Sequence, residues 1–226
     1  MLQDLSAGGA SGKGAGSAPA GVIVADVSDA SSCAQLAAST RLVLAAAGPF
    51  VRCSAAVLAA CVDKGTHYVD ITGETVPYVL HSVDAYHEAA ARVGAKIVHC
   101  CGYDSVPSDL LALMAIQTLA ANGHACETCH VAFDLLQTLG TASSGTIGSA
   151  LGMFAHIHSR PSSLKDFLDP HTLARPRPSH SVLTRVAIAL TGGDAWFLPG
   201  WSAAFGSWYF AFVMGIVNTK IVRRSR

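Results

Sequence analysis

The sequence predicts an α/β fold built around a parallel β-sheet. Short apolar runs without polar alternation recur four times between residues 21 and 123, and a segment with helical spacing follows each of them. Strands that are apolar on both sides are typical of parallel sheets with helices on both faces. Glycine or Asn-Gly ends three of the helical segments, where a left-handed residue commonly stops a helix.

The four β–α units follow one another without a long insertion. Strands are expected at 21–26, 42–47, 67–71 and 96–100, and helices at 28–39, 53–64, within 76–93 and at 107–121. Ser28 or Asp29 can cap the first helix. Gly65, Gly94 and Gly123 can end the later ones. Because the carboxyl ends of parallel strands meet at one edge of the sheet, the loops that leave them form the expected ligand crevice.

The regular pattern fades after residue 124. Residues 1–20 are rich in Gly, Ala and Ser, which is typical of a flexible segment. We therefore expect a flexible segment at 1–20, a first α/β domain at 21–123 and a second domain at 124–226. Within the second domain the pattern predicts a strand at 126–137, a helix in the later part of 138–159 and irregular chain at 159–182.

Composition and charge exclude some classes of function. The chain is 51% hydrophobic and 13% charged, against roughly 25% charged in typical soluble domains, and its formal net charge is zero. A neutral chain has no basic field to attract nucleic acid, so nucleic-acid binding is excluded as an expectation. The first residues lack the apolar core of a signal peptide, so we expect an intracellular, reducing environment for the seven cysteines.

Residues 195–217 form an uncharged run with three tryptophans, and Lys220, Arg223, Arg224 and Arg226 follow it. A run of this length is sufficient for a membrane span, and the trailing basic cluster fits the cytoplasmic side. Pro199, Gly200 and Gly206 interrupt it, which fits a broken segment packed within the protein. Association with a membrane surface or a lipid droplet is the third interpretation. All three interpretations stay open.

Cys126, Cys129 and His130 match the C-x-x-C-H pattern of covalent haem attachment. Such attachment occurs in exported proteins, and the segment has the pattern of a strand, so we expect no haem. A zinc site with His124, His156 or His158 would lack a second spaced pair of ligands. His156 and His158 are two residues apart, so on a helix they point to different faces. We therefore expect no metal.

The loop in CGYDSVPSDL (101–110) carries more polar groups than a helix start requires. Ser105, Pro107 and Asp109 suit the first turn of the helix that follows. Capping does not explain why Gly102, Tyr103 and Asp104 accompany them at a crevice position. The loop is therefore a candidate binding element.

Five ordered blocks carry a resemblance to a known family. They are AGPF (47–50), ACVDKGTHYVDITGE (60–74), CGYDSVPSDL (101–110), SSGTIGSAL (143–151) and VNTKIVRRS (217–225). Together they resemble the saccharopine dehydrogenase-like oxidoreductase family, which includes the trans-acting enoyl reductases of bacterial lipid assembly. The likeness covers residues 21–151 almost continuously and then the last dozen or so.

The resemblance implies a Rossmann-type dinucleotide-binding domain, a second α/β domain and an NADP or NAD cofactor. It implies a small-molecule, lipid-linked substrate and a site at the cytoplasmic face of a membrane or lipid droplet, with a mitochondrial location left open. The positions that match cofactor-side blocks of the family are Asp26, Ala47, Gly48, Pro49, Gly102, Tyr103, Asp104 and Ser105. Glu74 matches a block that faces the cleft. No catalytic acid is assigned, and His67 and His99 fit either an acid or a buried structural histidine.

The chain departs from the family at its start. The family opens with a strand, a Gly-rich turn and a helix that hold the pyrophosphate, and no such unit occurs here. Gly12-Lys13-Gly14 does not replace it, because its spacing is wrong for a phosphate loop. We therefore expect an internal piece of a longer enzyme, with a partial Rossmann-type sheet, an incomplete second α/β domain and weak or absent cofactor binding. The alternative is a non-catalytic, membrane- or lipid-droplet-associated binding protein that has lost the cofactor site.

Overall fold

The computed structural model describes residues 21–126, 129–132, 144–176, 200–203, 205–210 and 214–225. Its centre is a parallel sheet of three strands in the order β1 (Leu42–Ala45), β2 (His67–Asp70) and β3 (Ile97–Val98). Val43 pairs with Tyr68, and Tyr68 pairs with Ile97. The predicted partial Rossmann-type parallel sheet is confirmed.

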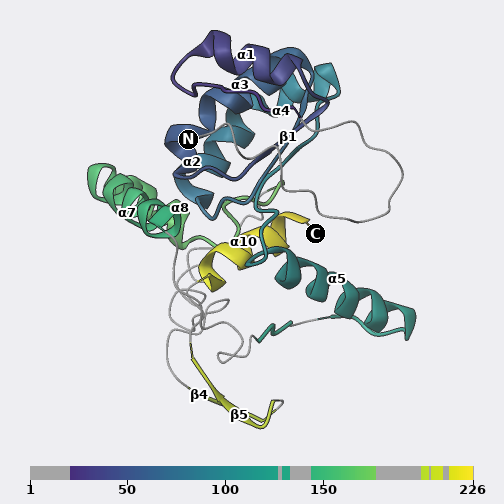
Figure 1. The fold of residues 1–226 in the computed structure, drawn as a ribbon. Coiled ribbons are helices and arrows are strands. Elements are labelled where there is room, and N and C mark those ends of the chain that lie inside the picture. The colour runs from purple at the N-terminus through teal and green to yellow at the C-terminus, as the bar shows by residue number, and fades with distance from the viewer. Residues whose placement is uncertain are drawn as a thin grey trace, which may run out of the picture.

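The helices of the β–α units lie together on one face of the sheet. The elements are α1 (Ala30–Ala38), α2 (Phe50–Cys53), α3 (Ala55–Lys64) and α4 (Leu80–Val93), which follows a π-helical turn, η2 (Thr75–Val79). Helix α3 packs against both α1 and α4, and the three form one layer (Figure 1). Right-handed connections between strands that advance in one direction place their helices on the same side, which explains the shared layer.

Local sequence signals begin and end these helices as expected. Asp29 is the N-cap of α1, and its Oδ1 accepts a hydrogen bond from the amide of Ser31 at 2.9 Å. Gly65 follows α3 with φ 69°, and Gly94 follows α4 with φ 70°. Both glycines occupy the left-handed region, which a residue with a Cβ adopts at a cost.

The hydrophobic core lies between the helix layer and the inner face of the sheet. Its buried members from α1, α3, β2 and η2 include Cys33, Ala37, Leu58, Cys61, Tyr68, Tyr78 and Val79, and Leu173 joins them from the second half of the chain. Burial raises the pKa of the Cys61 thiol to about 11, so this cysteine is an apolar core residue rather than a nucleophile. The opposite face of the sheet carries the exposed side chains of Leu42, Leu44 and Val98.

The strand predicted at 21–26 is wrong. These residues form no ladder, and Val22, Ile23 and Val24 are exposed. A strand needs a partner strand for its amides and carbonyls, and no described strand pairs with this segment. An apolar run indicates that a segment can form a strand, but it does not show that another strand is available to pair with it.

The second half of the chain contains α5 (Val106–Ala121), α7 (Ser144–Ser159), a 3₁₀ turn η3 (Pro161–Ser163), α8 (Leu164–Leu168) and α10 (Gly215–Ser225). Helix α10 returns to pack on α5, below the sheet in Figure 1. The helix predicted within 138–159 is confirmed over its described part. Of the strand predicted at 126–137, the described residues Cys126 and 129–132 are not in a strand, and the rest lies outside the described residues.

The uncharged run at 195–217 contains an antiparallel hairpin of β4 (Gly200–Ser202) and β5 (Ser207–Tyr209). Trp201 and Trp208 pair across it with ring centroids 6.0 Å apart. Among the helices in the described part of the chain, none has the length and hydropathy needed to cross a bilayer. The proposed division into domains at residues 20 and 123 stays a prediction.

Candidate functional site

Three loops meet at the carboxyl edge of the sheet, the position where ligands bind in open α/β folds. They follow β1, β2 and β3 and comprise residues 46–49, 71–74 and 99–105. A Cβ added at Gly102 would lie 3.4 Å from Cβ of Ile71, so the second and third loops are in contact. Around them, long-range hydrogen bonds from buried side chains fix the shape of this edge.

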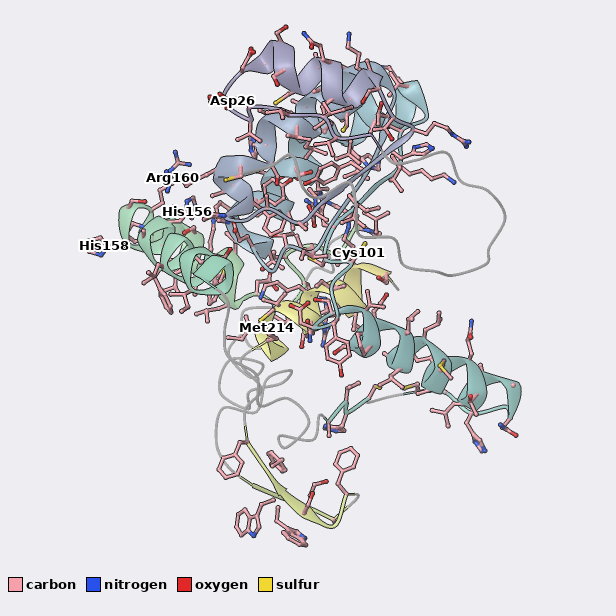
Figure 2. The ribbon with its side chains drawn as sticks, in the orientation of Figure 1. Asp26, Cys101, His156, His158, Arg160 and Met214 are labelled. Atoms are coloured by element: carbon pink, nitrogen blue, oxygen red, sulfur yellow. The ribbon has the colours of Figure 1, made fainter. Side chains whose placement is uncertain are left out.

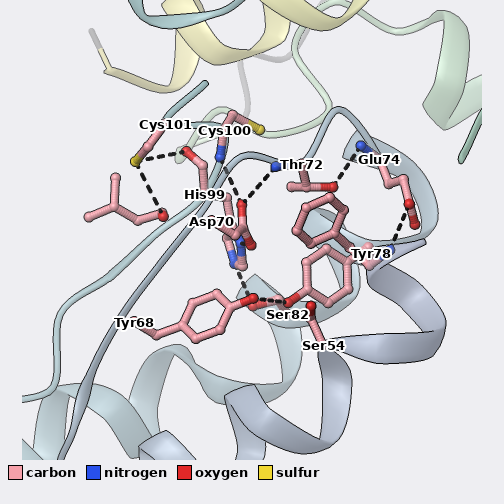
Figure 3. A network of polar contacts seen from close by, with 12 residues as sticks. Ser54, Tyr68, Asp70, Thr72, Glu74, Tyr78, Ser82, His99, Cys100 and Cys101 are labelled. Carbon is pink, nitrogen blue, oxygen red and sulfur yellow. Dashed lines mark hydrogen bonds and ion pairs between the residues drawn. The ribbon is translucent and has the colours of Figure 1, made fainter. Parts of the chain in front are cut away.

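Asp70, the last residue of β2, organises the turn after β3 (Figure 3). Its side chain is fully buried, and its Oδ1 accepts hydrogen bonds from the amides of Thr72 at 3.2 Å and Cys100 at 3.0 Å. The carbonyl of Asp70 accepts the amide of Cys101 at 2.7 Å. Cys100 has φ 63°, a left-handed conformation that is rare for a non-glycine residue. The buried carboxylate therefore holds the backbone in a conformation that it would not adopt alone.

The other carboxylate oxygen of Asp70 contacts a histidine. His99 Nδ1 lies 2.6 Å from Asp70 Oδ2, and His99 Nε2 lies 2.8 Å from Ser82 Oγ on α4. Tyr68 and Tyr78 share a hydrogen bond of 2.9 Å between their hydroxyls, and both rings lie edge-on to His99. Burial raises the pKa of both phenols well above their usual range, so they stay neutral hydrogen-bonding groups.

Glu74 clamps the loop after β1 to the loop after β2. Its carboxylate is 2% exposed and accepts the amides of Phe50 at 2.8 Å and Val51 at 3.0 Å, the first residues of α2. Ser149 Oγ on α7 donates to the same carboxylate at 2.7 Å. A carboxylate at a helix N-terminus satisfies free amides and complements the helix dipole. One buried side chain thus joins three segments of the chain.

Asn218 of α10 performs a similar task at the loop after β3. Its Nδ2 donates to the carbonyl of Asp104 at 2.7 Å and to Ser108 Oγ at 3.1 Å. Its Oδ1 accepts from Ser105 Oγ at 3.0 Å. The start of α5 is therefore held by a residue more than a hundred positions later in the chain.

The structure brings most of the predicted site residues to this edge. Gly48 and Pro49 precede α2, and a Cβ added at Gly148 of α7 would lie 3.5 Å from Pro49 Cγ. A Cβ at Gly102 would lie 2.7 Å from Asp104 Oδ1, so the Asp104 side chain folds over Gly102 and would have to move to make room for a larger residue. Burial raises the pKa of Asp104.

The remaining predicted residues differ in accessibility. Ala47 and Tyr103 are exposed, and Tyr103 is 78% exposed at the tip of its loop. Ser105 is buried and bonds to Asn218, so its role is structural. Asp26 is exposed and bonds within its own turn, where Ser28 lowers its pKa. It lies beside α1, well separated from Cys101 at the sheet edge (Figure 2).

Sequence reasoning named Glu74 as a cleft-facing residue but missed Asp70 and Asn218, which also shape this edge. Asp70 ends a strand and precedes a polar loop, which is a signal that could have singled it out. His99 was considered, but its pairing with Asp70 and Ser82 depends on the register of β2 and β3. Nothing in the sequence around Asn218 indicates its partners.

The loops after β1 and β3 present backbone and the exposed side chain of Tyr103 at the crevice. A pyrophosphate binds free amides at a helix N-terminus. The N-termini of α1 and α2 already bind the carboxylates of Asp29 and Glu74. Within the described ranges no group of three or more His, Cys, Asp or Glu side chains could hold a metal ion.

Comparisons with known proteins show what the chain is similar to. Residues 10–98 match the saccharopine dehydrogenase NADP-binding domain. A Mycobacterium tuberculosis protein provisionally named a trans-acting enoyl reductase is 34% identical over 204 residues, which are 90% of this chain and 48% of the relative. A Mycobacterium ulcerans protein named trans-acting enoyl reductase is 33% identical over 207 residues, with the same shares.

Residues 10–98 thus resemble the NADP-binding domain of the saccharopine dehydrogenase family, and most of the chain is similar to proteins named trans-acting enoyl reductases. The chain spans about half the length of the curated relatives that it matches. No solved structure gives a significant match. The family-model match ends at residue 98, so it includes the loops after β1 and β2 and stops where the loop after β3 begins.

Replacing Glu74 with Ala should destabilise the fold, because the buried amide of Phe50 and the partly buried amide of Val51 lose their acceptor. An unsatisfied buried donor costs about 1–3 kcal/mol. Urea unfolding followed by circular dichroism should show a loss of this size for Glu74→Ala. The control Glu88→Ala removes an exposed carboxylate from α4 and should change stability by less than about 0.5 kcal/mol. Equal effects of the two substitutions would contradict the clamp.

The raised pKa of Asp104 predicts a pH dependence of stability. Because burial raises the folded-state pKa above 3.8, the folded chain binds this proton more tightly than the unfolded chain does. The resulting stability is complete below about pH 3.8 and is lost as the pH rises through the folded-state pKa. Asp104→Asn should therefore gain in melting temperature relative to the parent between about pH 4 and about pH 7. A difference that stays constant with pH would contradict this assignment, and Asp63→Asn on the exposed surface of α3 is the control.

Proposed function

We propose that this chain is part of an NAD(P)-dependent oxidoreductase whose cofactor lies across the carboxyl edge of the β1–β2–β3 sheet. Two findings support the proposal. The family model that matches is an NADP-binding domain, and the named relatives are reductases. The loops after β1 and β3, which resemble the family's cofactor-side blocks, lie at one edge and are held there by Glu74 and Asn218.

Each predicted cofactor residue has a defined part in this proposal. Gly48 and Pro49 let the backbone pass close to the dinucleotide, with Ala47 exposed beside them. Gly102 lets the third loop close over Ile71, and Tyr103 offers an aromatic face to the nicotinamide end. Asp104 and Ser105 fix this loop on α10. Asp26 would meet the adenosine end from the exposed turn before α1, where its carboxylate accepts hydrogen bonds from Ser28.

The bound cofactor supplies a hydride. The crevice loops of this chain would position the cofactor and the substrate and exclude water from them. The relatives' printed name specifies an enoyl group, a carbon–carbon double bond next to a carbonyl, and this is the substrate class that we propose. A lipid-linked substrate fits the exposed apolar side chains on α5 and α7, namely Leu110, Leu111, Met114, Leu151 and Phe154.

A second candidate is a binding protein that keeps the fold without cofactor chemistry, associated with a membrane or lipid-droplet surface. One observation favours it. The N-termini of α1 and α2, which could bind a pyrophosphate, are occupied by the side chains of Asp29 and Glu74. Cofactor binding separates the two candidates.

Titration of the chain with NADPH and with NADH tests the proposal. We expect weak but saturable binding, detected as a thermal shift and a change in cofactor fluorescence. Tyr103→Ala should weaken binding about two- to tenfold, because an aromatic contact contributes about 0.5–1.5 kcal/mol. The side chain of Tyr103 is 78% exposed, so its removal should leave the fold intact.

Phe154→Ala is the matched control, since Phe154 is an exposed aromatic residue on α7 that belongs to no predicted cofactor position. It should bind both dinucleotides as the parent does. The absence of a response to either cofactor in the folded parent chain would reject the oxidoreductase proposal for this chain and favour the binding protein. Equal binding by Tyr103→Ala and the parent would reject the placement of the nicotinamide end.

A further inference from the structure

Ser82, His99 and Asp70 form a chain of hydrogen bonds that the proposed reductase does not use. The serine hydroxyl lies 2.8 Å from His99 Nε2, and His99 Nδ1 lies 2.6 Å from Asp70 Oδ2. The same two contacts join the serine nucleophile to its general base, and the base to an orienting carboxylate, in enzymes of unrelated folds. The three residues come from three separate elements, α4, the end of β3 and the end of β2 (Figure 3).

The hydrogen-bond directions follow from the partners of Asp70. An ionised carboxylate only accepts hydrogen bonds, so the hydrogen on the histidine ring lies on Nδ1, facing Asp70. His99 Nε2 then carries a lone pair and accepts the hydroxyl hydrogen of Ser82. The amides of Thr72 and Cys100 bind the other oxygen of Asp70 and fix the carboxylate in place. The serine thus faces a base whose tautomer and orientation are set by a third group.

This chain of hydrogen bonds opens into a cavity of about 410 Å³ between α4, β3 and α10. Ser82 and His99 both line it. Much of the remaining wall is apolar, with Val79, Val83, Ile97, Leu173 and Ile221 among its members. A volume of this size falls within the roughly 300–1,000 Å³ of small-molecule sites. The cavity therefore offers an apolar chamber next to a candidate nucleophile.

A cation lies in the same wall. Arg224 of α10 lines the cavity and donates one hydrogen bond to the carbonyl of Leu173 at 2.8 Å. A guanidinium carries five N–H donors, and this bond uses one of them. Partial burial and the neighbouring Arg175 lower the pKa of Arg224, which nevertheless stays protonated. Such a group is suited to the negative charge that forms on a carbonyl oxygen under attack.

We propose that Ser82, His99 and Asp70 are a nucleophilic site for carboxylic esters with an apolar acyl chain. Ser82 Oγ bonds to the carbonyl carbon while its proton passes to His99 Nε2. The ester C–O bond then breaks, and the alcohol leaves with the proton from His99. Water, deprotonated by His99, releases the acyl group from Ser82 and restores the hydroxyl. The net reaction converts one ester and one water into a carboxylic acid and an alcohol, and it needs no redox cofactor.

Covalent labelling with an alkyl fluorophosphonate tests this site directly. The folded chain should gain one phosphonyl group, and peptide mass spectrometry should locate it on Ser82. His99→Gln should slow labelling about 10²-fold or more, because a general base contributes about 10²–10⁴. Asp70→Asn should slow it as well, since the histidine loses its orienting carboxylate. The matched control Ser31→Ala, on the exposed surface of α1, should label at the parent rate.

Hydrolysis of 4-nitrophenyl octanoate gives a second readout. The parent should hydrolyse it faster than Ser82→Ala does. Because the cavity wall is apolar, the rate of the parent relative to the uncatalysed rate should be higher for the octanoate ester than for the acetate ester. Circular dichroism confirms that each variant is folded. A folded parent chain without a label on Ser82 overturns the proposal whatever the variants do. Equal labelling of His99→Gln and the parent overturns the role of the histidine. Neither outcome bears on NADPH binding.

Discussion

The buried carboxylate of Asp70 is the interaction on which the carboxyl edge of the sheet depends. It joins the end of β2 to Thr72, to Cys100 and to His99, and the Asp70 carbonyl adds Cys101. A fully buried charged group is tolerated only when hydrogen bonds replace its hydration. Its partners here are backbone amides of two loops, so satisfying the charge fixes both loops. The left-handed backbone of Cys100 is the visible consequence.

Two further buried side chains hold the loops around Asp70 in place. Glu74 fixes the loop after β1 through the start of α2, and Asn218 fixes the loop after β3 through the start of α5. Both act at helix N-termini, where free amides and hydroxyls concentrate. The cofactor edge and the Ser82 cavity consequently share one support. Asp70 Oδ1 binds the amides of the crevice loops and Asp70 Oδ2 contacts His99, so the two candidate sites share this carboxylate.

Local sequence signals were sufficient to predict most of the helices and strands. Gly65 could be assigned as a helix end, and the cap of α1 could be narrowed to Ser28 or Asp29, because both features depend on residue type. The strand predicted at 21–26 does not form, because an apolar run does not identify the strand with which it would pair. The bond between Ser105 and Asn218 joins residues 113 positions apart, and no local pattern encodes such a contact. The crevice could thus be located from strand ends, whereas the side chains that shape it required the register of the sheet.

Amide hydrogen exchange in Asp70→Ala tests the central role of this carboxylate most directly. If Asp70 holds the edge, exchange should accelerate in peptides that cover residues 71–75 and 99–106. The amides of α3, which belong to the core around Leu58, should keep most of their protection. Unchanged exchange at Thr72 and Cys100, or a uniform loss that includes α3, would contradict the account.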